Sequence, residues 1–288
     1  MLDYESQRKL IVVFILATIL IGIVTLVFLV YIWMPEPKAE ESKQQFEVGK
    51  VTVSDSSEKG IVQKYYKEIY TLLLNNDIDS IYAKTGEDYL KFNNMDKEAL
   101  RQFIVDKGVM SRGVELQQYQ SYSVPGYTAV YELDLKVKEQ AYSINVILRE
   151  VGPDDYTIAF EKFIDCIEDV HKQTLNSVEL DIYKRIRYTN SIQYEFKLTN
   201  NYDKVVKINA NREASPVILV NTQSKVQQPI MSNMITAEFS LNPNEVRDCT
   251  AVFKIDSTYD YLSYIKMVIK GVEYTGITGT SNLEFDLM

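Results

Sequence analysis

Few residues of this 288-residue chain have the types and spacing that catalysis or metal binding requires. His171 is the single histidine, and no cysteine or second histidine follows it at i+3 or i+4, so a metal site by spacing is absent. Asp154 and Asp155 would suit calcium, but no further oxygen ligands follow at regular spacing, and a hairpin turn is the expected structure. Nucleophile-elbow and glycine-rich phosphate-binding motifs do not occur. We therefore expect no metal, no cofactor and no enzymatic activity.

Cys166 and Cys249 are the two cysteines of the chain. Two cysteines do not make a disulfide framework, and they form no Cys-x-x-Cys metal or redox motif. In an oxidising exterior they could pair as one disulfide. Two unpaired buried thiols are the alternative, and the sequence leaves both open.

The 21 tyrosines are the most prominent group of side chains suited to binding. Tyrosine offers a large contact area with a polar tip, which suits protein interfaces. Tyrosine also favours strands, so a structural role in cores and on strand surfaces is the alternative. The candidate interface residues are Tyr65, Tyr66, Tyr119, Tyr122, Tyr127, Tyr131 and Tyr142.

An apolar run from Leu10 to Met34 contains no charged residue and is long enough to cross a bilayer as a helix. A cleaved signal peptide is the alternative, but the run is longer than such a segment and has no small-residue cleavage site. Tyr31 and Trp33 at its end suit the headgroup layer. Arg8 and Lys9 precede the run, so the positive-inside rule places the N-terminus in the cytoplasm. We expect a single-pass membrane protein.

The segments around this run complete the expected layout. Residues 1–9 form a short cytoplasmic tail, and residues 35–57, polar and rich in charge, form a flexible stalk. The net charge of −9 lies on the extracytoplasmic body, and it argues against binding nucleic acid or lying flat on anionic lipid. The absence of an Asn-x-Ser/Thr site agrees with a bacterial protein.

Periodicity predicts helices followed by an antiparallel sheet in the first folded domain, residues 58–165. Apolar residues recur at helical spacing from about Glu58, and Asn75 ends this helix. Two shorter helices are expected over about Asp79–Lys84 and Asp96–Lys107. The period then changes to two, which predicts strands at 127–137, 142–148 and 156–160, and the segment 114–123 is expected as a first strand ahead of them. The order indicates an α+β domain with helices on one face of a curved sheet.

The stretch YYKEIYTLLLNNDIDSIYAKTGEDYLKFNNMDKEALRQFI, with the hairpins that follow it, resembles the nuclear transport factor 2-like superfamily of cone-shaped α+β domains. The resemblance covers about residues 58–165 and implies a cone with an internal pocket. Some members use Asp, Tyr or His inside that pocket for proton transfer, and Asp134 is the corresponding candidate. Asp134 lies on the polar face of its strand, however, so we expect it to face solvent.

A helical or irregular connector is expected over residues 166–176, and a second, all-β domain over residues 177–288. Strand-like runs begin at about residues 178, 191, 204, 216, 235, 247 and 262, with polar turns between them. The phrases YEFKLTNNYDKVVKI and LNPNEVRDCTAVFKI resemble immunoglobulin-like β-sandwiches of bacterial surface proteins.

These features together predict a membrane-anchored, extracytoplasmic scaffold or interaction protein of a bacterial cell envelope. The layout is similar to the single-pass cone-domain subunits of conjugation and type IV secretion channels, although those do not carry a β-sandwich. Expected partners are the bilayer, through residues 10–34, and other envelope proteins or further copies of the chain. The alternative is an extracytoplasmic protein that binds or senses a small ligand or peptide in the cone cavity.

Overall fold

The computed structural model describes residues 58–110, 112–137, 142–152, 155–222, 225–234, 238–255 and 264–287. The chain divides into two compact units, Met1–Gln44 and Gln45–Met288, and every described residue belongs to the second. Of the described residues, 53% lie in strands and 19% in helices. The folded body is therefore built mainly from sheets.

Four helices occur among the described residues, and three of them lie where helical periodicity predicts them. Asp77 caps the second helix through the backbone N–H of Ser80, and Asp96 caps the fourth through that of Ala99, as expected for acidic N-caps. The helix that the sequence did not predict has only six residues and begins after Gly86. The helices are α2 (Glu58–Leu74), α3 (Ile78–Lys84), α4 (Glu87–Phe92) and α5 (Lys97–Asp106).

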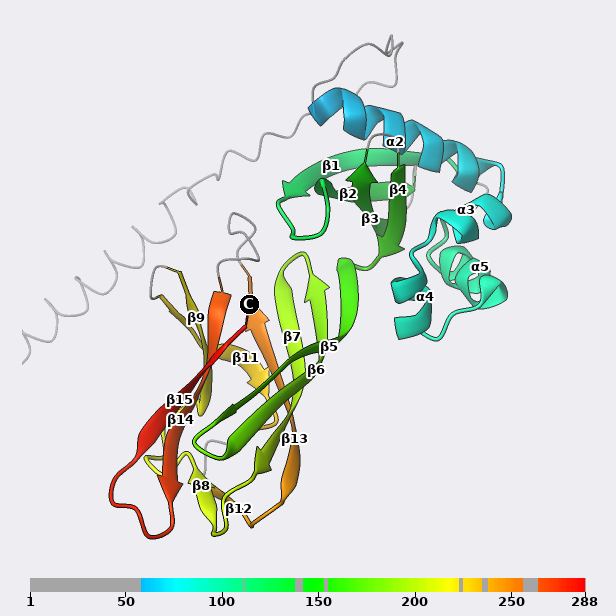
Figure 1. Ribbon diagram of the computed structural model, residues 1–288. Coiled ribbons are helices and arrows are strands. Elements are labelled where there is room, and N and C mark those ends of the chain that lie inside the picture. The colour runs from blue at the N-terminus through cyan, green and yellow to red at the C-terminus, as the bar shows by residue number, and fades with distance from the viewer. Residues whose placement is uncertain are drawn as a thin grey trace, which may run out of the picture. The chain divides into compact units, whose positions relative to one another are not determined.

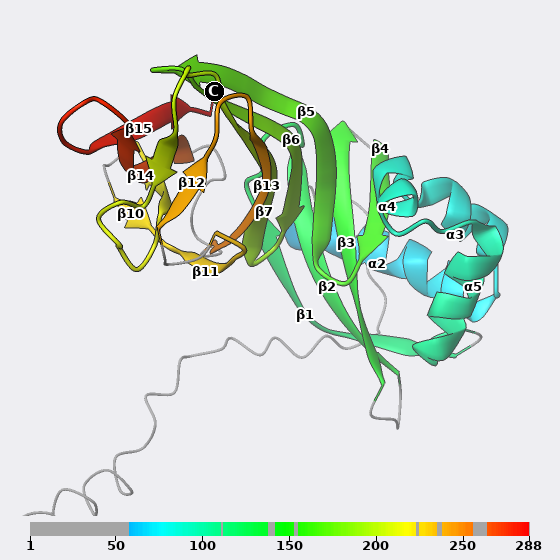
Figure 2. The same cartoon turned by 90° about the horizontal axis from the view of Figure 1, so that it is seen from below.

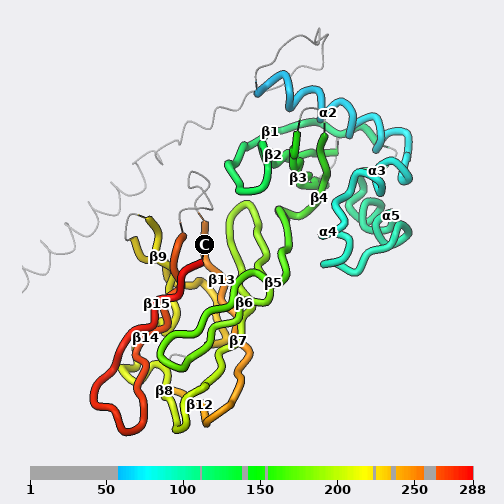
Figure 3. Tube along the Cα trace, in the orientation of Figure 1, coloured from blue at the N-terminus to red at the C-terminus, as the bar shows by residue number. Residues whose placement is uncertain are grey.

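The first four strands form one antiparallel sheet in the order β1-β2-β3-β4. Alternation of apolar and polar residues predicts the last three of these strands, the segment 114–123 was expected as the first, and all four strands are present. α2 covers one face of the sheet (Figure 1), and the trace places α3 beside α5 near the end of α2 (Figure 3). The strands are β1 (Val114–Tyr122), β2 (Ala129–Val137), β3 (Ser143–Gly152) and β4 (Asp155–Phe160).

The remaining strands form two further sheets. One has the order β11-β13-β7-β6-β5, and the other has the order β10-β9-β14-β8-β12, with β15 also paired to β14. β5, β6, β7 and β13 run side by side as one curved sheet (Figure 2). These strands are β5 (Phe163–Leu175), β6 (Val178–Tyr188), β7 (Ser191–Asn200), β8 (Val206–Ile208), β9 (Val217–Asn221), β10 (Val226–Gln227), β11 (Pro229–Ser232), β12 (Phe239–Leu241), β13 (Val246–Lys254), β14 (Tyr264–Tyr274) and β15 (Ser281–Asp286).

The expected fold class is wrong. It was an α+β nuclear transport factor 2-like cone followed by an immunoglobulin-like sandwich and preceded by one transmembrane helix. The described residues are instead mostly β, with four helices, and include no apolar membrane-spanning helix. Residues 166–176, expected as a helical or irregular connector, form most of the 13-residue strand β5. Register shifts between Phe163 and Asp165 and between Glu168 and His171 break the alternation there, so the strand has no period-two signal.

The predicted membrane anchor falls on a part of the chain that the structure leaves out. Among the described residues, no helix is long and apolar enough to cross a membrane. The run Leu10–Met34, the tail 1–9 and the stalk 35–57 all lie outside those residues.

Candidate functional site

The seven candidate interface tyrosines do not form one exposed patch. Four of them are buried: Tyr65, Tyr66, Tyr122 and Tyr131. Tyr119 and Tyr127 are half-buried, and Tyr142 is 53% exposed. The four buried tyrosines are therefore core residues.

Tyr65 and Tyr66 attach helix α2 to the sheet beneath it. The Tyr65 hydroxyl donates a hydrogen bond of 2.9 Å to Oε1 of Glu150 on β3, and its ring lies 4.4 Å from that of Tyr156 on β4. The Tyr66 hydroxyl donates to the carbonyl oxygen of Val114 at 2.8 Å. Both phenols are buried with partners, as the polar tip of a core tyrosine requires.

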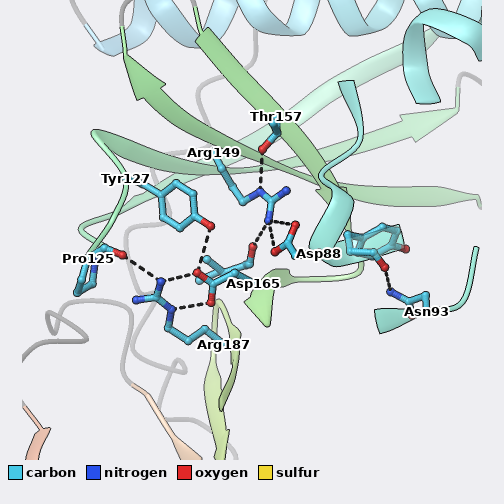
Figure 4. Close-up of polar contacts among 10 residues, drawn as sticks. Asp88, Asn93, Pro125, Tyr127, Arg149, Thr157, Asp165 and Arg187 are labelled. Atoms are coloured by element: carbon cyan, nitrogen blue, oxygen red, sulfur yellow. Dashed lines mark hydrogen bonds and ion pairs between the residues drawn. The ribbon is translucent and has the colours of Figure 1, made fainter. Parts of the chain in front are cut away.

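Tyr127 lies between two arginines at the centre of a buried charged cluster (Figure 4). The Cζ atoms of Arg149 and Arg187 lie 5.9 Å and 6.0 Å from the centre of its ring, within range of a cation–π contact. Its hydroxyl donates to Oδ2 of Asp165 at 3.1 Å. Burial, reinforced by the charge of Asp165, raises the pKa of Tyr127, so the phenol keeps its proton at neutral pH.

Arg149 on β3 is 2% exposed and is paired with Asp88 of helix α4. Its Nη1 lies 2.9 Å and 2.7 Å from the two carboxylate oxygens of Asp88 and donates to the carbonyl oxygen of Ile164 at 2.7 Å. Its Nε donates to Oγ1 of Thr157 at 3.1 Å. One guanidinium thus joins α4, β3, β4 and the start of β5 (Figure 4).

Arg187 on β6 forms a two-point contact with the carboxylate of Asp165 on β5. Nε donates to Oδ1 at 2.7 Å, Nη2 donates to Oδ2, and Nη2 also donates to the carbonyl oxygen of Pro125 at 3.0 Å. Both side chains are almost completely buried. The planar fork of arginine matches a carboxylate in this geometry, which is the arrangement that a buried ion pair needs.

Both arginines of this cluster are paired within the fold. Each of the two guanidinium groups faces its own carboxylate, and the one phenol between them holds its proton. No serine, cysteine or histidine in it forms the hydrogen-bonded nucleophile–base pair that covalent catalysis uses. The cluster fixes how the four-stranded sheet, α4 and the β5–β6 hairpin meet.

A pocket of about 660 Å³ lies beside Arg149, and its charges are also paired. Lys91 contacts Glu168 at 2.8 Å, and Asp88 is held by Arg149. Cys166 lines the pocket, and burial raises the pKa of its thiol. A thiol with a raised pKa is a poor nucleophile at neutral pH.

The disulfide between Cys166 and Cys249 does not form. The structure describes both residues as free thiols. Cys166 lies on β5 and Cys249 on β13, and β6 and β7 separate these strands in the sheet. Three strand spacings amount to about 14 Å, whereas a disulfide needs Cα atoms closer than about 7 Å. The structure therefore agrees with the alternative of two unpaired thiols. Burial raises the pKa of Cys249 to about 12.

His171 and Asp134 both differ from their expected surroundings. His171 is a half-buried residue of β5, opposite Ile182, and its Nε2 has no hydrogen-bond partner among the described residues. Asp134, expected to face solvent, is half-buried in a pocket of about 340 Å³. Burial, and then the charge of Glu132, raise the pKa of Asp134.

The exposed apolar residues of the described chain include a group on two edge strands. β10 is at the edge of one sheet and β11 at the edge of another, and only Gln228 separates them in sequence. Ile230 and Met231 on β11 are 64% and 62% exposed, and Val226 on β10 is also exposed. We call Val226, Ile230 and Met231 the apolar edge. Apolar side chains on an open strand edge are unusual unless a partner covers them.

Sequence reasoning missed both the charged cluster and the apolar edge. A usable signal existed for Arg149, because it directly follows the apolar residues Ile147 and Leu148, and β3 is buried on both faces. A charged residue at the end of such a strand is expected to be buried with a partner. The apolar edge had no such signal, because strands of two and four residues show no period.

No protein-family model matches the chain, and no curated protein matches it.

Proposed function

We propose that this chain is a non-enzymatic interaction protein of a bacterial cell envelope, attached to the membrane through its apolar residues 10–34. Its folded body lies outside the cytoplasm and recruits another envelope protein or a second copy of the chain. The similarity to channel subunits of conjugation and type IV secretion depends on a cone fold, so channel membership is not part of the proposal.

The apolar edge is the observation that carries the proposal. Ile230 and Met231 present two large side chains to solvent on a strand whose outer side pairs with no described strand. Covering one such side chain contributes about 1.5–3 kcal/mol, which is enough to anchor an interface. Proteins protect open edges with charges, proline, bulges or short length; β11 has no charge, and its protection consists of Pro229, the register shift between Pro229 and Met231, and its length of four residues.

The charged cluster supports the proposal in a second way. Its two ion pairs, Arg149 with Asp88 and Arg187 with Asp165, hold α4, the four-stranded sheet and the β5–β6 hairpin together. A body held together in this way presents the apolar edge to a partner protein as a preformed surface. Binding to a preformed surface costs little ordering entropy.

The test compares the full-length protein in phosphatidylcholine nanodiscs with a variant that carries Ile230→Lys and Met231→Lys. We expect the wild type to recover one or more defined envelope proteins, or further copies of itself, and the variant to lose this recovery at least tenfold. Ile277→Lys is the matched control, because Ile277 is 56% exposed on the turn between β14 and β15. Equal recovery by all three proteins would exclude the apolar edge as the interface.

A further inference from the structure

A second pocket has properties that the interaction function does not use. Its volume is about 340 Å³, and it is lined by β1, β2, the β4–β5 turn, the β6–β7 turn and the end of β13. Glu132 and Asp134 contribute two carboxylates from the same face of β2. Opposite them on β1, Gln120 pairs with Glu132 and Gln118 pairs with Asp134. The floor of the pocket is therefore rich in oxygen acceptors.

The acceptors of this floor are only partly used by the protein. The hydroxyl of Tyr122 lies 2.8 Å from Oε2 of Glu132. Nζ of Lys162 stays 3.9 Å from Oε1 of Glu132, and the lysine side chain is half exposed at the rim. No described residue donates a hydrogen bond to the carboxylate of Asp134. The pocket thus contains a half-buried carboxylate that has no donor among the described residues.

Thr189 supplies an independent sign that a donor or acceptor is missing. It lines the same pocket, is 2% exposed, and its Oγ1 has no hydrogen-bond partner among the described residues. Its backbone N–H donates to the carbonyl oxygen of Lys162 at 2.9 Å, which holds the residue against the β4–β5 turn. Buried hydroxyl groups nearly always have a partner, so an unsatisfied one beside a pocket indicates a ligand.

We propose that this pocket binds the primary ammonium group of a small organic amine. An ammonium group has three N–H donors and one positive charge, which match the carboxylates of Asp134 and Glu132 and the hydroxyl of Thr189. A metal ion fits less well, because the described residues bring no three metal-binding side chains together. The volume admits a small molecule and suits a ligand of a few carbon atoms.

Two lysines, Lys162 and Lys254, line the pocket beside the two carboxylates, and the charge of Lys162 opposes part of the effect that burial and Glu132 have on the pKa of Asp134. Burial and the neighbouring Glu132 raise the pKa of Asp134, which means that the empty pocket disfavours its negative charge. A bound cation would relieve both effects. Groups whose charge is unfavourable in the fold are frequent at binding sites, because the ligand provides the compensation.

Saturation-transfer difference NMR of the full-length protein in phosphatidylcholine nanodiscs tests the proposal, with butylammonium as the probe and 1-butanol as its neutral match. We expect transfer to butylammonium above that of empty nanodiscs, and none to 1-butanol. Asp134→Asn and Thr189→Val are each expected to weaken the signal at least about fivefold, because each removes a partner of the ammonium group.

Controls separate binding from folding. Asp155→Asn removes an exposed carboxylate at the start of β4, outside the pocket lining, and is expected to leave the signal unchanged. Thr189→Val is expected to unfold at the same temperature as the wild type or higher, because the lost hydroxyl has no partner. Equal signals from butylammonium and 1-butanol, a signal that survives both pocket variants, or binding of calcium alone would overturn the proposal.

Discussion

The contact between Arg187 and Asp165 is the charged pair whose loss should most destabilise this protein. Both side chains are almost completely buried, and removal of either one takes away the charged group that faces the other. A buried charge without a partner costs far more than the intact pair contributes. The pair also holds the hydroxyl of Tyr127 and the carbonyl of Pro125, so its loss would loosen two further contacts.

Asp165→Ala is predicted to lower the free energy of unfolding by about 3–5 kcal/mol, as measured by denaturant titration of the full-length protein. Asp155→Ala, at an exposed site, should change it by less than about 0.5 kcal/mol. The double change Asp165→Leu with Arg187→Met should cost less than Asp165→Ala, because it leaves no unpaired charge. A loss below about 1 kcal/mol for Asp165→Ala would contradict the structural role of the pair.

Asp134→Asn is predicted to stabilise the protein at pH 7, by less than about 1 kcal/mol because the side chain is only half-buried and solvent screens it. The pKa of Asp134 is raised in the folded state, so its charge opposes folding once the pH exceeds that pKa. Below the ordinary carboxyl pKa of about 3.9 the residue is neutral in both states, and the gain should vanish. Thermal unfolding at pH 7 and pH 3.5 measures this. A gain that is the same at both values would show that the charge is not the cause.

The sequence predicted the positions of the strands better than it predicted which residues matter. Tyrosine was correctly singled out as abundant, but contact area alone does not distinguish a core position from an interface. Tyr65 and Tyr66 are in the core because they fall on the buried face of α2 with Val62 and Ile69. Asp134 was identified as a candidate from a resemblance, yet its pocket includes turn residues that no local pattern brings to β2.

At the scale of elements, the start of helix α4 depends on Gly86 lying against Arg149. The backbone of Gly86 is extended, with φ −60° and ψ 134°, so any residue could adopt it. A Cβ atom there would lie 1.5 Å from Nη2 of Arg149. The guanidinium cannot simply turn away, because Asp88 and the carbonyl of Ile164 hold it in place.

Gly86→Ala is therefore predicted to lower the free energy of unfolding by about 1–3 kcal/mol, the usual cost of forcing extra volume into a packed site. Gly152→Ala is the matched control, because a Cβ at Gly152 would meet nothing within 4 Å. Denaturant titration compares the two. If both variants match the wild type, the close approach between Gly86 and Arg149 does not constrain α4.

Long elements with a clear period were predictable, and short or bulged ones were not. The sequences of α2, β2 and β3 follow helical or alternating patterns, although β2 and β3 are buried on both faces over much of their length. β5 has 13 residues, but two register shifts interrupt its pairing with β6. Its buried residues therefore do not alternate regularly along the strand. Because β5 lacked a regular pattern, residues 166–176 were expected as a helical or irregular connector instead of a strand.

At the scale of the whole molecule, the proposed function depends on two apolar features of the chain. One is the segment of residues 10–34, and the other is the apolar edge. Residues 10–34 and the net charge of −9 motivate the envelope location, and neither is tested by the described residues. The apolar edge is a property of the fold: it arises where β10 and β11 end two sheets. Sheet order is a long-range property, so no local pattern could have predicted which strands would be edges.

Photocrosslinking in bacterial cells that express the full-length chain tests the central claim most directly. A photoreactive amino acid replaces Met231 in one variant and Ile277, the exposed control, in another. The proposed function predicts that position 231 gives an adduct of one defined mass, either with an envelope protein or with a second copy of the chain, while position 277 gives none. No adduct at 231, or the same adducts at both positions, would contradict an interface at the apolar edge.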